Sequence, residues 1–318
     1  MIDLFIFDIN RINALPNNVA ATHFLLTYMH WCFSLIQPAA CIRYLWRMNK
    51  ATNLALQTAA IVTEENPFDS EQAIESSNYA GFIDKKLVAG DDLSEKPEPL
   101  LGFIHDSFRA LVLNPQFSCV GAKSAIQQGG YRFGHYDELS GKEATAGLAR
   151  DLFHFLQEQP LLEGEFSTFV ATFSNPIIHS EEQFEKLLWQ QLQLLYELDA
   201  PLHAWDPQVS DDPEHPHFAF SFATQSFFVV GLHPVASRYT RRFAWPTLVF
   251  NLHEQFEILR DEGRFERMQK VIRSRETALQ GSINENLSDY GSKSDARQYS
   301  GRPVSENWEC PFSTKKDD

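Results

Sequence analysis

The stretch SFFVVGLHPVASRYTRRFAWPTLVFNLHEQFEILR, residues 226–260, does most to decide the fold. It contains two short apolar runs, Phe227 to Leu232 and Trp245 to Phe250, which are rich in aromatic and β-branched residues. Such runs are too short for an ordinary helix and are typical of buried strands. Residues 253–260 then have apolar side chains at helical spacing and follow Asn251, a good N-cap residue. Two strands and then a helix are predicted.

Each apolar run ends within a few residues of a histidine. His233 lies between Gly231 and Pro234 at a strand end, where functional side chains are common, so we predict that it faces a cavity. His253 is predicted in the first turn of the helix, where the helix dipole disfavours a protonated imidazole and so favours the neutral form that binds metals. We therefore predict His233 as a metal ligand and His253 as the reserve. A hydrogen-bonded structural role is the alternative for either histidine.

Three arginines, Arg238, Arg241 and Arg242, lie between the two strands. Their guanidinium groups are permanent cations suited to carboxylate partners, so we predict that they bind an acid-bearing cofactor. Ordinary ion pairing is the alternative. Cys119, in FSCVGAK, is a further candidate ligand through a thiolate, although its apolar neighbours also suit a buried small residue.

The composition is that of a large acidic globular chain. With 318 residues, 43% of them apolar, it can form one or two domains with a substantial core. The net charge of −15 argues against binding to nucleic acid or to an anionic membrane, because both need a basic surface. The four cysteines have neither CxxC spacing nor the density of a disulfide framework, so we predict no structural zinc and a cytoplasmic location.

The N-terminal region differs in composition from the rest. Residues 1–47 contain no Lys, Glu or Gly. A membrane span over residues 19–46 would be interrupted by histidine, proline and arginine, and a secretory signal would need a basic start. We favour an extension outside the domain, translated upstream of a true start at Met48. Residues 48–98 are polar and are predicted to be a partly disordered lead-in, and residues 313–318 a tail.

Residues 99–312 are predicted to form the folded domain. Residues 100–113 and 143–157 have helical periodicity, and a third helix begins at SEEQ, where Ser180 can cap it and Gln183 can close the capping box. The candidate strands are Tyr131 to Tyr136, Thr168 to Phe173, Phe218 to Phe222, Phe227 to Leu232 and Thr247 to Phe250. This mixture favours an α+β class with a single mixed-sheet domain flanked by helices.

Five blocks of the sequence resemble one known family. They are PQFSCVGAKSAIQQGGYRFGHYDEL (115–139), EATAGLARDL (143–152), WDPQVSDDP (205–213), GLHPVASRYTRRFAWPTLVFNLHEQFEILR (231–260) and DARQYSGRPVSENWECPF (295–312). In this order they resemble the YqcI/YcgG family, members of which are associated with haem-dependent N-hydroxylation of guanidine groups in the guanitoxin and D-cycloserine pathways. The resemblance begins near Leu100, which makes residues 1–47 a non-family extension.

The resemblance implies a haem enzyme that hydroxylates a nitrogen of a guanidino or amino compound such as arginine. It implies dioxygen or peroxide as oxidant and an external electron donor, and it leaves a homodimer open. A guanidinium substrate calls for a carboxylate partner, for which Asp206 and Glu138 are candidates, and the ring of Trp205 could stack on the cation.

Two other functions are compatible with the residues. The first is a haem-binding sensor or carrier without turnover, which would use the same histidine and arginines. The second is a non-haem iron oxygenase whose ligands are His215, His217 and Glu214, although these also suit a solvated loop. Neither GxGxxG nor GxxxxGK[ST] occurs, so a nucleotide cofactor is disfavoured. The choice of an enzyme over a carrier rests on the resemblance alone.

Overall fold

The computed structural model describes residues 65–162, 164–284, 286 and 291–314, so the extension at residues 1–47 and the first part of the lead-in lie outside the described residues. The described strands are β1 (Ala80–Ile83), β2 (Lys86–Ala89), β3 (Tyr131–Glu138), β4 (Thr168–Asn175), β5 (Phe220–Phe222), β6 (Gln225–Leu232) and β7 (Thr247–Leu252). They form one sheet in the order β2-β1-β3-β4-β7-β6-β5. β3 and β4 are parallel and every other pair of neighbours is antiparallel.

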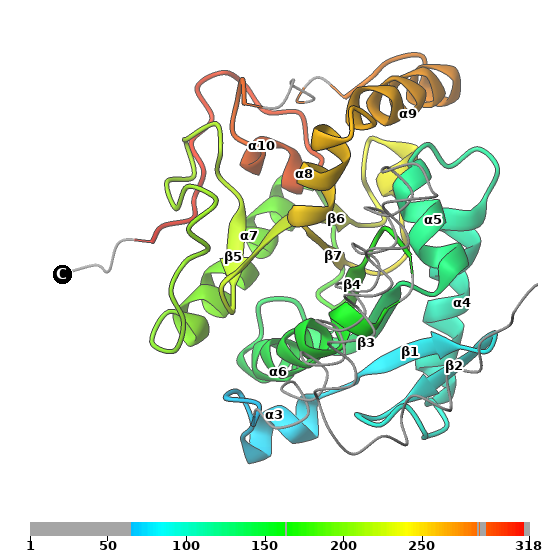
Figure 1. Cartoon of the computed structure of the whole chain (residues 1–318), viewed down its shortest axis with the longest axis vertical. Helices are drawn as coiled ribbons and strands as arrows, with labels where there is room; N and C mark the ends of the chain where they lie inside the picture. The colour runs from blue at the N-terminus through cyan, green and yellow to red at the C-terminus, as the bar shows by residue number, and fades with distance from the viewer. Residues whose placement is uncertain (1–64, 163, 285, 287–290, 315–318) are drawn as a thin grey trace, which may run out of the picture. The chain divides into compact units, whose positions relative to one another are not determined.

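Helices cover both faces of this sheet. They are α3 (Glu71–Ser76), α4 (Pro99–Leu113), α5 (Val120–Gln128), α6 (Lys142–Glu158), α7 (Glu181–Asp199), α8 (Glu254–Asp261), α9 (Phe265–Gln280) and α10 (Ala296–Tyr299), with 3₁₀ turns η2 (Gln159–Leu161) and η3 (Tyr239–Arg241). α4 and α5 lie on one side of the sheet, and α6 and α7 on the other (Figure 1). The predicted α+β mixed-sheet class is confirmed. None of the described helices combines the length and apolarity that a membrane span requires.

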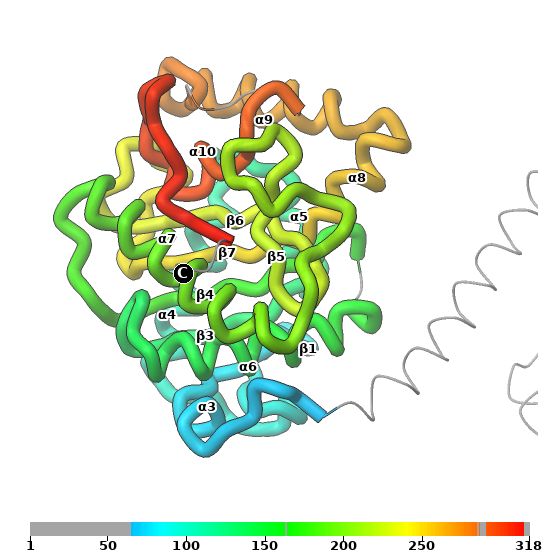
Figure 2. Tube along the Cα trace, turned by 90° about the vertical axis from the view of Figure 1, so that its left-hand side faces the viewer, coloured from blue at the N-terminus to red at the C-terminus, as the bar shows by residue number. Residues whose placement is uncertain are grey.

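The two faces of the sheet bury two separate groups of apolar side chains. Val229 of β6 and Phe250 of β7 belong to the layer that includes α6 and α7, whereas Val230 and Val249 pack in the layer that includes α4. Successive side chains of a strand point to opposite faces, so the parity of a residue decides which layer it enters. The C-terminal segment returns over the α7 side (Figure 2), where Phe312 packs against Trp189 at a centroid distance of 6.2 Å.

The predicted strands Phe218 to Phe222 and Phe227 to Leu232 are confirmed as β5 and β6, which pair as an antiparallel hairpin. Its two turn residues, Ala223 and Thr224, have φ of 49° and 61°, which non-glycine residues adopt at a cost. The backbone N–H of Ala223 donates a 3.0 Å hydrogen bond to the Asp199 carboxylate at the end of α7. This contact from another element helps to hold a turn that the local sequence does not favour.

The part of the lead-in that the structure describes, residues 65–98, is folded into the domain instead of preceding it as a disordered segment. It supplies α3 and the two strands β1 and β2, and β1 pairs with β3 at the register Ala80↔Phe133. Both strands are only four residues long, and β2 is the edge strand of the sheet. Four residues are barely enough for a strand pattern, so the polar composition of the surrounding residues concealed them.

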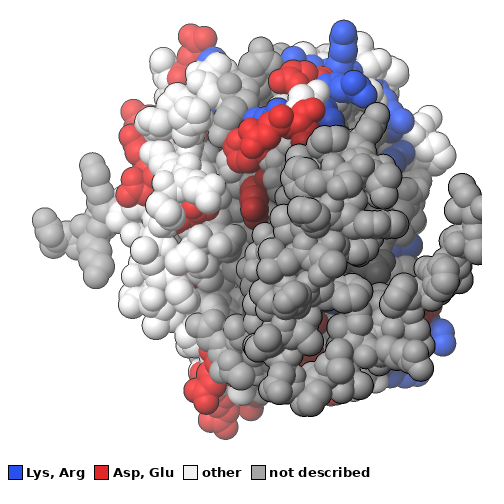
Figure 3. Space-filling view, viewed as in Figure 1, with Lys and Arg blue, Asp and Glu red and all other residues white. Residues whose placement is uncertain are grey.

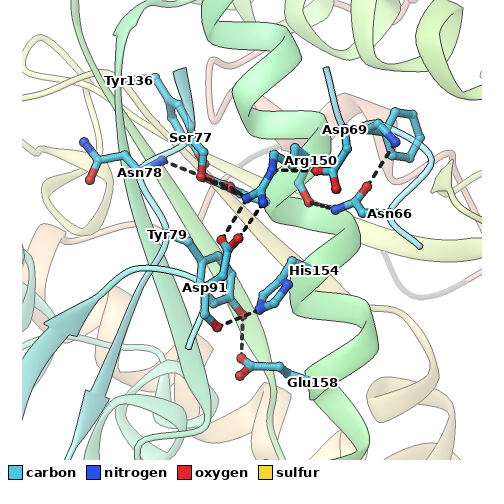
Figure 4. A network of polar contacts seen from close by, with 12 residues as sticks. Asn66, Asp69, Ser77, Asn78, Tyr79, Asp91, Tyr136, Arg150, His154 and Glu158 are labelled. Atoms are coloured by element: carbon cyan, nitrogen blue, oxygen red, sulfur yellow. Dashed lines mark hydrogen bonds and ion pairs between the residues drawn. The ribbon is translucent and has the colours of Figure 1, made fainter. Parts of the chain in front are cut away.

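A network of polar groups, some buried and some exposed, joins this N-terminal segment to α6 (Figure 4). Arg150 of α6 donates to Asp69 at 2.8 Å and to both carboxylate oxygens of Asp91 at 2.8 and 2.5 Å. The neighbouring Asp151 carboxylate accepts from the Tyr136 hydroxyl at 2.7 Å and from the Ser77 hydroxyl at 2.5 Å. Burial raises the pKa of Asp151, because removing a charged carboxylate from water costs free energy. The hydrogen bonds offset this cost, and we assign the network a structural role.

Candidate functional site

A cavity of about 300 Å³ lies on the α4 side of the sheet. Its floor consists of inward-facing side chains of two strands, Phe228, Val230 and Leu232 from β6 and Val249 and Asn251 from β7. Residues of α4, α5, α8 and α9 complete the wall, which is mainly apolar with a few charged groups. This volume is at the lower end of the range of about 300–1,000 Å³ for small-molecule sites, and the lining is typical of them.

Helix α9 closes one side of the cavity. Phe265, Met268, Ile272 and Glu276 line it, and their spacing of three or four residues places them on one face of the helix. Most other residues of α9 are exposed. Figure 3 shows Lys and Arg side chains gathered at the upper right, where Figure 1 places α9. One face of α9 therefore shields the cavity while basic side chains on the other face reach solvent.

His253 lines this cavity and is only 6% exposed. Asn251 is not the helix N-cap as predicted. It pairs with Phe228 inside the sheet, and His253 itself occupies the N-cap position of α8. β7 therefore extends to Leu252, beyond the predicted apolar run. The Asn251 side chain also donates to the Phe228 carbonyl at 3.1 Å. Because side chains alternate between the two faces of a strand, Val249, Asn251 and then His253 all lie on the side of the cavity.

The imidazole of His253 is held in a form suited to metal binding. Burial lowers its pKa, so the ring is predominantly neutral near pH 7, in the direction that the sequence predicted. Its Nδ1 lies 3.5 Å from Oε1 of Glu257, one turn along α8, and Arg260 contacts the same carboxylate. A carboxylate beside one ring nitrogen orients a histidine whose other nitrogen binds a metal.

Arg241 supplies a cation at the cavity wall. Its guanidinium donates to three backbone carbonyls, those of Gly231 at 3.0 Å and of Tyr299 and Gln298 at 3.1 Å each. Within the described part of the chain no carboxylate oxygen lies within 4.0 Å of it. Burial lowers its pKa to about 10, which still leaves it charged at neutral pH. Glu276 attracts Arg241 at longer range, but the direct hydrogen-bond partners of Arg241 are neutral carbonyls. A partly buried cation of this kind attracts an anion.

The other two predicted arginines differ from Arg241. Arg238 lines the cavity, but its charge faces Glu276 at 3.5 Å and it donates to the Ser282 carbonyl at 2.8 Å. Arg242 is exposed, lies over the ring of Tyr239 at 4.6 Å and does not line the cavity. Of the three, Arg241 is therefore the best placed to bind an acid group in the cavity.

Cys119 also lines the cavity, at the N-cap of α5. Its sulfur accepts a 3.4 Å hydrogen bond from the backbone N–H of Ala122. Burial raises the pKa of the Cys119 thiol, so the thiolate that ligates iron is disfavoured. Its geometry agrees with the alternative of a small residue in an apolar wall.

His233, the first choice of ligand from the sequence, does not line the cavity. Its ring stacks on Phe184 of α7 at a centroid distance of 4.3 Å, on the opposite side of the sheet. The close approach is allowed by Gly231, since a Cβ there would meet Phe184 at 2.5 Å. His233 is 1% exposed, and neither of its ring nitrogens has a hydrogen-bond partner among the described residues. Only its backbone reaches the arginine loop, through a 3.0 Å bond from its N–H to the Arg241 carbonyl.

The burial of His233 predicts a pH-dependent stability. Desolvation lowers its pKa from 6.5 to about 4, so the unfolded chain binds more protons between these values and folding weakens as the pH falls. From pH 8 to pH 5 the loss is about 2 kcal/mol in the free energy of unfolding. Burial also lowers the pKa of His105 to about 4, and this residue adds the same pH-dependent loss to the wild type and to His233→Phe. Denaturant unfolding at both pH values should therefore show a loss that is about 2 kcal/mol smaller in His233→Phe than in the wild type. An equal pH effect in the two proteins would contradict the prediction.

The three predicted substrate-binding residues lie elsewhere. Trp205 packs in the aromatic core against Phe218 and Phe312 at 6.0 Å each. Asp206 is buried and accepts from the backbone N–H of Ser226, so it fixes a turn. Glu138 is exposed at the end of β3. None of the three lines the cavity.

The residues of the predicted non-haem iron site lie on an exposed loop. The rings of His215 and His217 are 5.6 Å apart, and Nδ1 of His215 accepts from the backbone N–H of His217. Glu214 accepts from the backbone N–H of Cys310 instead. Across the described ranges no three His, Cys, Asp or Glu side chains are gathered so that they could hold a metal ion.

The residues that line the cavity fall within the segment that matches a known protein family. The sequence model of the YqcI/YcgG family matches residues 108–313. The chain belongs to the YqcI/YcgG family. The Uncharacterized protein YcgG of Bacillus subtilis (strain 168) is 30% identical over 163 residues, which are 48% of this chain and 64% of that protein. The match thus spans less than two thirds of that relative. No solved structure gives a significant match.

Two acidic residues of the cavity within the YqcI/YcgG match, Glu276 and Asp295, were not predicted. The sequence held a signal for Glu276, because it continues the helical spacing of Phe265, Met268 and Ile272 along α9. Asp295 opens the last block by which the chain resembles the YqcI/YcgG family, DARQYSG. Its place beside β6 and β7 depends on contacts between distant segments and has no local signature.

Proposed function

We propose that this protein is a haem-dependent oxygenase that hydroxylates a nitrogen of a small guanidino or amino compound such as arginine. The reaction type rests on the resemblance to haem-dependent guanidine N-hydroxylases. The lining of the cavity supports the choice of haem as cofactor and the cavity as its binding site. His253 would ligate the iron, and Arg241, with Arg238 beside it, would bind the propionate groups.

The observation that carries the proposal is the meeting of two groups in one apolar cavity. One is the neutral imidazole of His253, oriented by Glu257 at 3.5 Å. The other is the Arg241 guanidinium, whose hydrogen bonds within the described residues all go to backbone carbonyls. Haem is an apolar plate with an iron centre and two acid groups, so it needs this combination. A porphyrin fills most coordination sites of its iron, which makes one protein ligand sufficient.

The chain's own residues would supply binding, orientation and the exclusion of water, while bound haem supplies the oxidation chemistry. Phe265, Met268 and Ile272 of α9 cover the cavity and would keep bulk water from the reacting nitrogen. Insertion of one oxygen atom from dioxygen into an N–H bond consumes two electrons and two protons and releases water. An external donor would provide those electrons, whereas peroxide would need none.

The proposal is tested by the absorption spectrum of the protein purified from haem-supplemented cells. A Soret band at about one haem per chain is expected. The coloured protein should then convert arginine to a product heavier by one oxygen atom when an oxidant and electrons are supplied. Mass spectrometry with labelled dioxygen identifies the origin of the added atom.

Two results would contradict different parts of the proposal. A colourless protein that does not take up added haem would remove the cofactor assignment. A coloured protein that leaves every guanidino and amino compound unchanged, with dioxygen or with peroxide, would favour the haem-binding sensor or carrier.

A further inference from the structure

One carboxylate of the same cavity has no salt-bridge partner among the described residues. Asp295 lines the cavity together with His253 and Arg241. Its neighbours in the chain, Ser294 and Ala296, are 5% and 1% exposed, so its backbone is fixed in the core. The carboxylate therefore has a defined position at the cavity wall.

The Asp295 carboxylate has one neutral hydrogen-bond partner. The side-chain amide of Gln298 donates to its Oδ1 at 3.1 Å. Within the described ranges, no nitrogen of a Lys, Arg or His side chain lies within 4.0 Å of its oxygens. Arg260 attracts it only at longer range, and burial raises the pKa of Asp295 to about 6. It is thus predominantly charged at neutral pH, at a cost in solvation.

The second acid of the cavity is already compensated. Glu276 accepts from the hydroxyls of Ser118 and Thr240, the latter at 2.9 Å, and lies 3.5 Å from Arg238. Asp295 has no such set of partners. A bound molecule that carries a positive nitrogen would supply the missing partner, whereas a neutral or anionic one would leave the carboxylate uncompensated.

We propose that Asp295 binds the cationic nitrogen group of the molecule that reacts in this cavity, and so selects guanidinium or ammonium compounds over neutral ones. The inference rests on the proposed function for its reaction, but the binding site itself stands on the cavity. Oδ2 and the remaining lone pair of Oδ1 can accept two parallel N–H bonds, so guanidinium suits the site better than ammonium.

The test compares the binding of three probes to the purified full-length protein by titration calorimetry. Arginine carries a guanidinium, lysine an ammonium, and citrulline a neutral urea of nearly the same shape as guanidinium. The wild type should bind arginine at least about tenfold more tightly than citrulline. Asp295→Asn should weaken arginine binding at least about tenfold and abolish this preference. Asp261→Asn, at an exposed position on α8, should change neither affinity.

Other variants and readouts separate binding from folding and from the cofactor. Asp295→Asn should melt at the same temperature as the wild type or higher, since it removes a partly buried charge that has no salt-bridge partner among the described residues. Asp295→Glu keeps the charge and should retain a preference for cations. The Soret band should be unchanged in both, because Asp295 is assigned no role in binding haem.

Two results would overturn this inference. One is an Asp295→Asn protein with wild-type affinity for arginine and lysine, and the other is a folded wild type that does not discriminate either cation from citrulline. A colourless protein with arginine binding that depends on Asp295 would refute the haem proposal and leave this one intact.

Discussion

Replacement of His253 by alanine is expected to abolish the Soret band, whereas replacement of His233 should leave it unchanged. Both histidines follow a strand and both are buried, but only His253 lines the cavity. His233 lies against Phe184 on the other side of the sheet, where a haem ligand would have no space. The measurement is a haem titration of each purified variant, followed by absorbance. Added imidazole should partly restore the band of His253→Ala.

Cys119→Ser is the matched control for this experiment. Cys119 lines the same cavity, and serine preserves its size, so a lost band in this variant would identify the sulfur as the ligand. Since burial disfavours its thiolate, we expect the serine variant to keep the wild-type spectrum. A colourless His233→Ala together with a coloured His253→Ala would reverse the assignment. Each variant should be checked for a cooperative melt before haem is added.

The secondary structure was largely predictable because its strongest signals are local. The third predicted helix begins at Ser180, which caps α7 by accepting from the Gln183 N–H at 3.1 Å, and its apolar stripe packs in the core. The strand at Phe227 to Leu232 was likewise evident from a short run of apolar residues. Periodicity and capping act within a few residues, so a single sequence reveals them.

The side of the sheet on which each histidine lies could not be predicted from local signals. From its position between Gly231 and Pro234, His233 was predicted to face a cavity. The ring of Phe184 from α7 lies against His233 instead. On β7, Asn251 is part of the sheet, and the alternation of side chains along the strand then brings His253 to the cavity. Both outcomes depend on pairing between distant segments.

The charges of the cavity were also only partly predictable. The arginine cluster was visible, but the ion pair of Arg238 with Glu276 depends on α9 folding back over the sheet. That pairing leaves Arg241 as the cation with neutral partners. Composition and spacing cannot separate three neighbouring arginines, whereas their partners in three dimensions can.

Replacement of Arg241 by alanine is expected to weaken haem binding about hundredfold, which corresponds to about 2.7 kcal/mol. Its guanidinium is a partly buried cation that would pair with a propionate, and removal of one partner of such a pair leaves the other charge poorly solvated and uncompensated. The measurement is the dissociation constant from a haem titration. Arg241→Lys should give an intermediate affinity, because it keeps the charge and loses the planar fork.

Arg242→Ala provides the matched control, since Arg242 is the next residue of the same loop but is exposed and lies over Tyr239. It should bind haem like the wild type. Arg241 also holds the carbonyls of Gly231 and Tyr299, so its loss can loosen the cavity without any cofactor. Melting of the haem-free proteins separates this effect, because a purely structural role lowers the melting temperature equally with and without haem. Equal haem affinity in Arg241→Ala and Arg242→Ala would show that the cavity does not bind the propionates through Arg241.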